Sequence, residues 1–398
     1  MDGPTGGRDT AVPNSPRLYT LPLDRRRFLI LVGGAAAWTA LGPYAALAAK
    51  SGALAALQPW TLPERVSGNE IEIARALIGA AVLAPSHWNT QPWRFEVEGP
   101  LIRLLADPQR ALPTIDPEGR ALRLSLGAAL ENLLVAARAW GLRPAVTYRP
   151  AGDPSGVVAE VSWSAGEAAR DRALFHAIVE RRTNRDAYDG RGLFGENRAA
   201  LSGQAMDGFR LHWIEDPDRI RTIGDLAHDA VHDAVMDHAS QSECFAWTRF
   251  GDDARRRGDG VPVDALALGW PARWLAGHTL DPNSWLLGQG AGSLGKQARR
   301  GVRSAGALAL LTTATEREDA WLEGGQVYER LALKATQLGI AQQPIQAVLE
   351  RERSRGELLA HFNATGEDPL MFLRLGHADR PRETERRAVA VVASLRKA

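Results

Sequence analysis

The segment 84–95 places several polar side chains in one short turn between two prolines. Ser86, Asn89 and Gln91 supply one hydroxyl and two amides. Such groups donate and accept hydrogen bonds, so they suit a flat heterocycle that carries its own donors and acceptors. The same composition also suits a plain capped loop without a ligand. Taken alone, the segment leaves both interpretations open.

A second segment, 180–190, concentrates positive charge around a hydroxyl, in the order Arg181, Arg182, Thr183, Asn184, Arg185. Planar guanidinium donors and a hydroxyl can converge on the oxygens of a phosphate. A solvated helix end would have the same composition. Near the C-terminus, Arg386 and Arg387 are either further ligands of that phosphate or surface charge.

Two other patterns invite a functional interpretation that the sequence does not favour. The run Gly290 to Lys296 fits a dinucleotide fingerprint and most of a phosphate loop. However, Gln297 stands where magnesium binding needs Ser or Thr, and no convincing strand precedes the run. A lid loop is the preferred interpretation. His228 and His232 lie one helical turn apart, as in a zinc hydrolase, but without a convincing third ligand, so a polar helix face is favoured.

The one cysteine, Cys244, excludes an internal disulfide and has no His base beside it, which favours an inert thiol. The charge is nearly balanced, with 48 Lys and Arg against 47 Asp and Glu. No basic field exists that would bind nucleic acid.

The elements that must position these residues follow from hydrophobic periodicity. Helices are predicted at 70–83, 125–142, 171–182, 217–237 and 324–338, and strands at 94–98, 101–105, 145–148, 157–163, 307–313 and 369–375. Residues 215–300 are less regular and are interpreted as an excursion or lid.

Two of the predicted helices share a sequence pattern. Glu131, Leu133, Ala137 and Gly141 recur at one constant offset as Glu329, Leu331, Ala335 and Gly339. An Ala/Leu helix that ends in Gly can match in this way by chance. If the pattern is a duplication, each half of the chain contributes one equivalent helix to a shared core.

The N-terminus has the features of an export signal. Arg25, Arg26 and Arg27 precede an apolar stretch to Gly42 and a small-x-small triplet that ends at Ala48. This order is typical of a twin-arginine signal peptide. We therefore expect the export machinery as a partner and a periplasmic or extracellular location; an uncleaved signal would be the sole membrane attachment. Because this pathway carries folded proteins, it favours a cofactor enzyme.

Together, these motifs resemble the nitroreductase family over most of residues 70–395, and least at 215–300. The family signature Pro-Ser-x-x-Asn-x-Gln-Pro-Trp is complete from Pro85 to Trp93, and its Arg-x-Ser-x-(Arg/Lys) motif is present with Thr183 in place of Ser. Its Glu-Gly before a long helix matches Glu323-Gly324, and its closing strand matches Leu375-Gly376-His377.

The resemblance implies bound FMN, which the family holds at a dimer interface. It implies a phosphate site formed by Arg181, Thr183, Arg386 and Arg387, with Arg185 near the N1–O2 edge of the flavin. It also implies that the ring is contacted by Pro85, Ser86, Asn89 and the signature's Gln91, and that Glu323-Gly324 brings an amide to N5. The signature precedes the arginine motif by nearly 100 residues, a departure from the common order. That order resembles an internally duplicated branch, in which one chain imitates the dimer and keeps one flavin.

We therefore expect an α+β fold, with a mixed, mainly antiparallel sheet flanked by helices and two fused pseudo-repeats in one monomeric chain. The expected parts are a signal peptide at 1–48, a first half at 49–165 and a second half at 166–398 with a lid-like insertion at about 215–300. The expected function is an FMN-dependent oxidoreductase that passes hydride or electrons to a small organic acceptor, without a side-chain acid or base. The alternative is a flavin-sequestering protein whose lid blocks turnover.

Overall fold

The structure is a computed structural model that describes residues 60–149, 155–169, 172–250, 253–266, 285–314 and 318–396. All of them belong to one compact unit, residues 56–398. The predicted signal peptide at 1–48 lies outside the described residues. Among the described helices, none combines the length and the apolar character that a membrane span needs.

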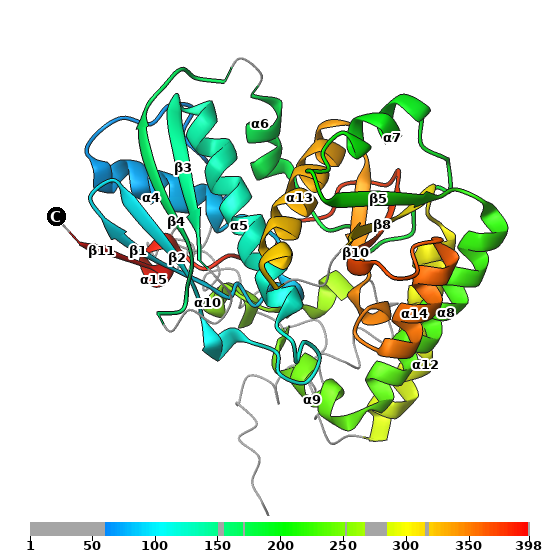
Figure 1. The fold of residues 1–398 in the computed structure, drawn as a ribbon. Helices are drawn as coiled ribbons and strands as arrows, with labels where there is room; N and C mark the ends of the chain where they lie inside the picture. The colour runs from blue at the N-terminus through cyan, green and yellow to red at the C-terminus, as the bar shows by residue number, and fades with distance from the viewer. Residues whose placement is uncertain are drawn as a thin grey trace, which may run out of the picture. The chain divides into compact units, whose positions relative to one another are not determined.

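The first half of the chain forms a five-stranded sheet with the order β11-β1-β2-β4-β3. Its antiparallel strands are β1 (Trp93–Glu98), β2 (Leu101–Ala106), β3 (Leu142–Tyr148) and β4 (Val157–Ala165). The C-terminal strand β11 (Ala393–Arg396) returns to this sheet and pairs in parallel with β1. The helices of this half are α4 (Glu70–Ala81), α5 (Arg120–Ala139) and α6 (Ala173–Glu180) (Figure 1).

The second half forms a four-stranded antiparallel sheet with the order β5-β8-β10-β9. The strands are β5 (Phe209–Ile214), β8 (Ala307–Thr313), β9 (Ala341–Pro344) and β10 (Asp368–Gly376). Every residue of β8 is buried, as expected for a central strand covered on both faces. The helices are α7 (Gly195–Ser202), α13 (Glu318–Gln337) and α14 (Glu352–His361), whereas the short α15 (Val389–Val392) near the C-terminus packs against α4 and β1 of the first half.

The two sheets have the same connectivity. In each, a hairpin-like strand pair is followed by one long helix and a second pair: β1-β2-α5-β3-β4 in the first half and β5-β8-α13-β9-β10 in the second. The helices α5 and α13 pack against each other between the sheets (Figure 1). Both end at a glycine with left-handed φ, Gly141 and Gly339. The predicted α+β fold with two pseudo-repeats is confirmed.

The halves differ in the connection between the first two strands. Two residues join β1 to β2, whereas a long insertion joins β5 to β8. Its elements are α8 (Pro217–Met236), α9 (His238–Ala246), β6 (Thr248–Arg249), α10 (Asp253–Arg257), β7 (Val261–Pro262), the 3-10 turn η3 (Val263–Leu266) and α12 (Trp285–Arg303).

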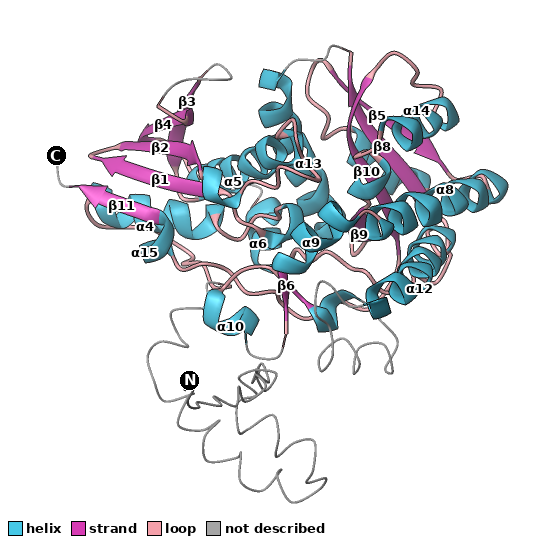
Figure 2. Ribbon diagram, turned by 90° about the horizontal axis from the view of Figure 1, so that it is seen from below, coloured by secondary structure: helices cyan, strands magenta, loops and turns pink. Residues whose placement is uncertain are grey.

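The glycine cluster at 290–296 lies inside α12, so the predicted lid loop is wrong there. Helix α12 runs beside α8 (Figure 2). A Cβ at Gly295 would lie 2.9 Å from the His228 ring on α8, and a Cβ at Gly301 would lie 3.3 Å from the Arg374 guanidinium. Glycine therefore allows α12 to approach its neighbours closely, and this packing offsets its low helix propensity.

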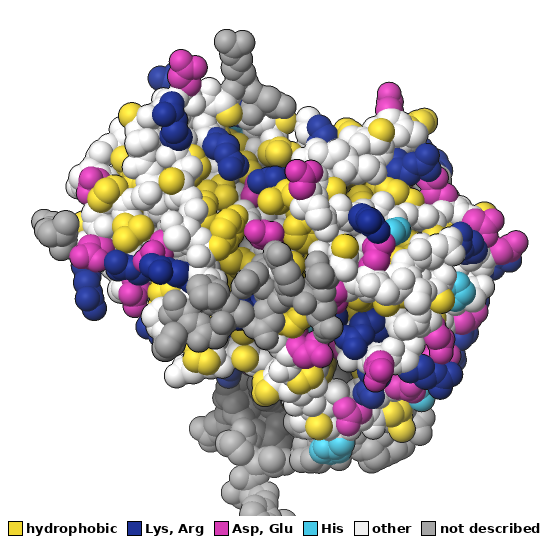
Figure 3. Space-filling view, viewed as in Figure 1, with side chains coloured by type: hydrophobic (Ala, Val, Ile, Leu, Met, Phe, Trp, Pro, Cys, Tyr) yellow, Lys and Arg dark blue, Asp and Glu magenta, His cyan; other side chains and the backbone are white. Residues whose placement is uncertain are grey.

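On the face of the molecule seen in Figure 3, acidic and basic side chains are interspersed. This distribution agrees with the nearly balanced charge of the sequence, and a field of one sign is not seen on that face.

Candidate functional site

The signature loop lies between α4 and β1 and has an unusual backbone. Trp88, Asn89 and Gln91 have φ values of 50°, 52° and 52°, a backbone region that residues other than glycine rarely adopt. Ser86 Oγ accepts a hydrogen bond of 2.9 Å from the backbone nitrogen of Gln91 and so closes the turn. A strained backbone of this kind persists only where the surroundings fix it, and such positions cluster at functional sites.

The two signature amides fix the loop by binding backbone from distant segments. Asn89 Nδ2 donates to the carbonyl of Gly260 at 2.8 Å, and its Oδ1 accepts from Arg386 Nη1 at 3.0 Å. Gln91 Nε2 donates to the carbonyl of Gly258 at 2.7 Å, and its Oε1 accepts from the Arg387 amide at 2.8 Å. The loop thereby holds the insertion on one side and the C-terminal tail on the other.

Five arginines line a small cavity of about 50 Å³ beside the loop: Arg181, Arg182, Arg185, Arg382 and Arg386. Arg181 directly follows α6 and is 2% exposed, yet its Nη1 has no hydrogen-bond partner among the described residues. Burial and the neighbouring arginines lower the pKa of Arg386 to about 9, and burial with the neighbouring Arg380 lowers that of Arg182 to about 10. A buried group of cations with unsatisfied donors fits a bound phosphate, whose charge would offset their repulsion.

The ring of Trp60 covers two of these cations. The Arg182 guanidinium lies 4.0 Å from the ring centroid and that of Arg386 lies 5.0 Å away. The indole Nε1 donates to the Thr384 carbonyl at 3.0 Å, which ties the start of the described chain to the tail. These contacts leave the other faces of the guanidinium groups for an anion.

A larger cavity of about 420 Å³ adjoins the small one. Both are lined by Pro85, Ser86, Thr183, Arg185 and Val261. The loop at 85–93 and the arginine segment at 181–185, which are distant in sequence, therefore meet at one site. This is the arrangement that the sequence predicted.

Arg185 lies at the junction of the two cavities. Burial lowers its pKa, and among the described residues no hydrogen bond or ion pair is formed by its guanidinium. The buried Arg374 donates to the carbonyls of Asn184 and Asp186, at 3.2 and 2.8 Å, and so fixes the backbone on both sides of Arg185. A cation held in this way is positioned for an electron-rich group of a ligand.

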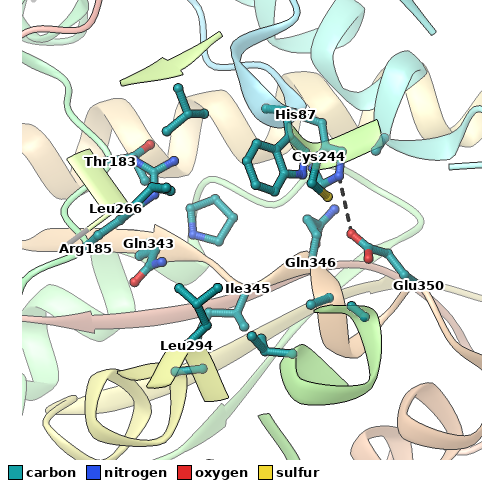
Figure 4. Close-up of a pocket in the computed structure, with 18 of the residues that line it drawn as sticks. His87, Thr183, Arg185, Cys244, Leu266, Leu294, Gln343, Ile345, Gln346 and Glu350 are labelled. Carbon is teal, nitrogen blue, oxygen red and sulfur yellow. Dashed lines mark ion pairs between the residues drawn. The ribbon is translucent and has the colours of Figure 1, made fainter. Parts of the chain in front are cut away.

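The insertion forms much of the wall of the larger cavity. Apolar side chains of α8, α9 and α12 and of the segments between them contribute, among them Val231, Val235, Phe245, Phe250, Val263 and Ala298. Figure 4 shows the polar residues at this cavity, with Thr183 and Arg185 on one side and His87, Cys244, Gln346 and Glu350 on the other. An apolar wall with few polar groups suits a flat organic ring.

Comparison with known proteins agrees with this arrangement. The chain is 31% identical over 316 residues to a protein of Mycobacterium tuberculosis (strain ATCC 25618 / H37Rv) named "Putative NAD(P)H nitroreductase Rv3131", covering 78% of this chain and 86% of the relative. The chain belongs to the nitroreductase family. It is also 25% identical over 340 residues to the "Putative NAD(P)H nitroreductase acg" of the same strain, covering 82% of this chain and 96% of that relative. A search of family models found no match.

Solved nitroreductases resemble about half of the chain. A nitroreductase of Desulfitobacterium hafniense with bound FMN is 17% identical, with a TM-score of 0.31, covering 53% of this chain and 92% of that one. The FMN-dependent nitroreductase NfnB of Mycobacterium smegmatis in complex with NADPH is 23% identical, with a TM-score of 0.29, covering 56% and 92%.

Four residues that the family resemblance assigned to the site do not line either cavity: Gln91, Glu323, Gly324 and Arg387. Gln91 is fully buried in its contacts with backbone. Arg387 Nη1 donates to the Gln91 carbonyl at 3.1 Å and lies 3.9 Å from Asp107, so it holds the tail in place. Both residues therefore hold the signature loop and the tail in place without lining a cavity.

Glu323 and Gly324 lie within α13 rather than before it, because that helix begins at Glu318. A Cβ at Gly324 would lie 2.6 Å from Leu370, so this glycine packs in the core. At the offset that relates the two helices, Ser125 of α5 is equivalent to Glu323, and Ser125 lines the larger cavity. Of these two equivalent residues, Ser125 of the first repeat lines the cavity and Glu323 of the second does not.

Sequence reasoning also missed Trp60, Thr384, Ser125, Tyr328 and Glu350 as residues that line the cavities. The constant offset between the repeats would have indicated Ser125. No sequence pattern marks Trp60, whose role depends on the return of the tail to the first half.

The remaining patterns have structural explanations. The His228 and His232 rings stack on α8 at 6.0 Å, and no group of three or more metal-binding side chains is found in the described part of the chain. Burial, Glu350 and Glu243 raise the pKa of Cys244, which disfavours a reactive thiolate.

Proposed function

We propose that this chain binds FMN and acts as an FMN-dependent oxidoreductase that reduces a small organic acceptor. The observation that carries this proposal is the junction of a buried arginine cavity with a larger apolar cavity at Ser86, Thr183 and Arg185. A phosphorylated planar cofactor has these two chemical parts. The family membership and the names of the mycobacterial relatives support the same activity.

The residues fit the cofactor in distinct roles. Arg181, Arg182 and Arg386 would hold the phosphate, and Pro85 and Ser86 would lie against the ring system. When bound, FMN supplies the transfer of hydride or electrons. Arg185 would place positive charge beside the ring, where it stabilises negative charge that develops on reduction. The apolar side chains of the insertion exclude water from this reaction.

The absorbance spectrum of protein purified from its native host tests the cofactor. We expect the spectrum of bound flavin and release of FMN on denaturation. Colourless protein that does not bind added FMN would overturn the proposal.

The electron donor and turnover need a second test, because the insertion that covers the cavity also suits a flavin-sequestering protein. Yellow protein is mixed anaerobically with NADPH and, separately, with dithionite. Rapid bleaching by NADPH supports an oxidoreductase with a nicotinamide donor. Bleaching by dithionite alone, with no transfer to quinone or nitro acceptors, supports sequestration.

We also propose that the two halves arose by duplication and that one chain imitates the two-chain dimer of the family. The contacts between α5 and α13 are reciprocal, as in a two-fold interface. Glu131 binds Arg330 at 2.6 Å, and at the equivalent positions Asn132 donates to Glu329 at 3.0 Å in the amide orientation that satisfies both groups. Light scattering of the holoprotein should give the mass of one chain, whereas a stable dimer would contradict the proposal.

For the location, we propose twin-arginine export of the folded holoprotein, based on Arg25 to Arg27 and the following apolar stretch. Changing this arginine run to lysine should retain the protein in the cytoplasm with its flavin bound. Export that does not depend on these arginines would contradict it.

A further inference from the structure

His87 is a signature-loop residue whose side chain faces the larger cavity. Its backbone nitrogen donates to Ser125 Oγ at 3.2 Å, which fixes the start of the side chain. The side chain is 14% exposed, and its Nε2 has no hydrogen-bond partner among the described residues. Since Nε2 has only an ion-pair contact with Glu350, a ligand oxygen can complete its hydrogen bonding.

Glu350, from the second half of the chain, lies beside the same nitrogen. It lies between the 3-10 turn η4 (Gln346–Val348) and α14, and its Oε1 is 3.3 Å from His87 Nε2 (Figure 4). Its side chain is 16% exposed. His87 is the basic side chain in contact with this largely buried carboxyl group.

The pair lies away from the phosphate end of the site. Neither His87 nor Glu350 lines the small arginine cavity, and Figure 4 shows both across the larger cavity from Thr183 and Arg185. A cofactor anchored by its phosphate at the arginines would enter the larger cavity from the Arg185 side, and His87 and Glu350 lie on the other side.

Few other groups at this cavity could supply a proton. Besides the pair, the weak acids that line it in the described residues are Cys244 and Tyr328, and burial raises the pKa of both. Arg185 keeps its protons, and the glutamine amides and hydroxyls at the cavity are too weakly acidic. His87 is the residue type suited to proton transfer near neutral pH.

We propose that His87 and Glu350 form the acceptor subsite, which takes a flat, uncharged aromatic carbonyl or nitro compound and donates a proton from His87 Nε2 to its oxygen. This inference rests on the proposed function and replaces the expectation that no side-chain acid takes part. For a quinone, bound reduced FMN would supply a hydride, which carries two electrons and one proton. The second proton comes from His87, so that both oxygens end as hydroxyls, and solvent then returns a proton to the ring with Glu350 stabilising its charge.

The test uses the reduced holoprotein and two oxidants in rapid mixing. 2-Methyl-1,4-naphthoquinone needs protons, whereas ferricyanide accepts electrons alone. In His87→Gln, the ratio of the quinone rate to the ferricyanide rate should fall about 10²-fold, the typical contribution of a positioned acid, and in Glu350→Gln by a smaller factor. His212→Gln is the matched control, because His212 forms a His–Glu pair with Glu367 at 2.9 Å outside the cavity. An unchanged ratio in His87→Gln would overturn proton donation.

A binding measurement separates this inference from the proposed function. Quenching of tryptophan fluorescence by the naphthoquinone is measured with and without FMN. His87→Gln retains a hydrogen-bond donor and should bind as the parent protein does, whereas His87→Leu should bind about tenfold more weakly, as loss of one buried hydrogen bond implies. Equal binding by all three proteins would refute the subsite. Absence of flavin with normal, His87-dependent quinone binding would refute the oxidoreductase and keep the subsite.

Discussion

Gly127 of α5 and Gly325 of α13 occupy equivalent points of the central helix pair, and each lies against the backbone of the other helix. A Cβ at Gly127 would overlap the carbonyl oxygen of Leu322, and a Cβ at Gly325 would overlap that of Leu124. Leu124 and Leu322 are themselves equivalent at the same offset. Two crossing helices can come this close only where both lack a side chain at the contact.

We predict that Gly127→Ala lowers the free energy of unfolding by about 1–3 kcal/mol or more, because the added methyl meets backbone that cannot rotate away. Urea denaturation measures the change. Gly356→Ala is the control: this glycine lies within α14 and has open space around its Cβ position. It should raise stability by about 0.4–1 kcal/mol. Equal effects of the two substitutions would argue against close packing of α5 on α13.

A second prediction follows from the arginine cavity and concerns the phosphate of FMN. Arg181→Gln removes a buried cation with free donors and should weaken FMN binding by about 10- to 100-fold, the range of one charged hydrogen bond. Riboflavin, which lacks the phosphate, should bind equally well to both proteins. Flavin fluorescence titrations give both affinities.

Arg380→Gln is the control for charge alone, because Arg380 forms an exposed ion pair with Glu180. It should leave FMN affinity nearly unchanged. If Arg181→Gln weakened the binding of riboflavin as much as the binding of FMN, the phosphate would have to lie elsewhere.

Glu329 should make FMN binding depend on pH. Burial raises its pKa to about 8, although Arg181 and Arg386 attract the charged form. The folded protein therefore binds this proton more tightly than the unfolded chain, whose carboxyl titrates near 4.5, and stability falls as the pH rises between these values. Above about pH 8 the carboxylate competes with the phosphate for Arg181, 3.4 Å away.

We therefore expect the affinity for FMN to decrease as the pH rises through 8 and expect Glu329→Gln to reduce this dependence. Titrations on both sides of that pH provide the measurement. Glu131→Gln is the matched control, since Glu131 is equally buried at the equivalent position but binds Arg330 instead. A parent protein whose affinity is constant across pH 8 would contradict the role of Glu329.

The fold was predictable where periodicity is strong and local. The pattern of Glu131, Leu133 and Ala137 identified α5, and its repetition at Glu329 identified α13, because both helices bury one continuous Ala/Leu face. Strand β8 was predicted at its observed bounds because a run of apolar residues was fully buried. The short strands β9 and β11 were missed, since each has four residues and depends on neighbours distant in sequence.

The site was predictable in its location but not in the direction of every side chain. The composition of the signature identified Ser86, and the arginine motif identified Arg181 and Arg185, all of which line the cavities. Whether an amide faces a ligand or a backbone carbonyl depends on which segment folds against it. Asn89 and Gln91 face the insertion and the tail, and neither segment lies near them in sequence.

The last prediction concerns Gln91 as the residue that joins three segments. Its Nε2 and Oε1 pair with the Gly258 carbonyl and the Arg387 amide, and the side chain is fully buried. Gln91→Ala leaves two buried backbone groups unpaired, each at a cost of about 1–3 kcal/mol, so the free energy of unfolding should fall by roughly 2–6 kcal/mol. Gln337→Ala, which removes an exposed glutamine of α13, should change stability by less than about 0.5 kcal/mol.

Hydrogen exchange distinguishes a local role for Gln91 from a general loss of stability. The Gly260 amide donates to the Asn89 carbonyl at 3.1 Å, and the Arg387 amide donates to Gln91. In Gln91→Ala both amides should exchange faster than the strands of the second sheet, because local opening of the insertion and the tail then needs less free energy than global unfolding. The arginine cavity would open with them, so FMN should dissociate faster than from the parent protein. Uniform acceleration across the sheets and the loop would mean that Gln91 stabilises the core as a whole and does not specifically hold the insertion and the tail on the site.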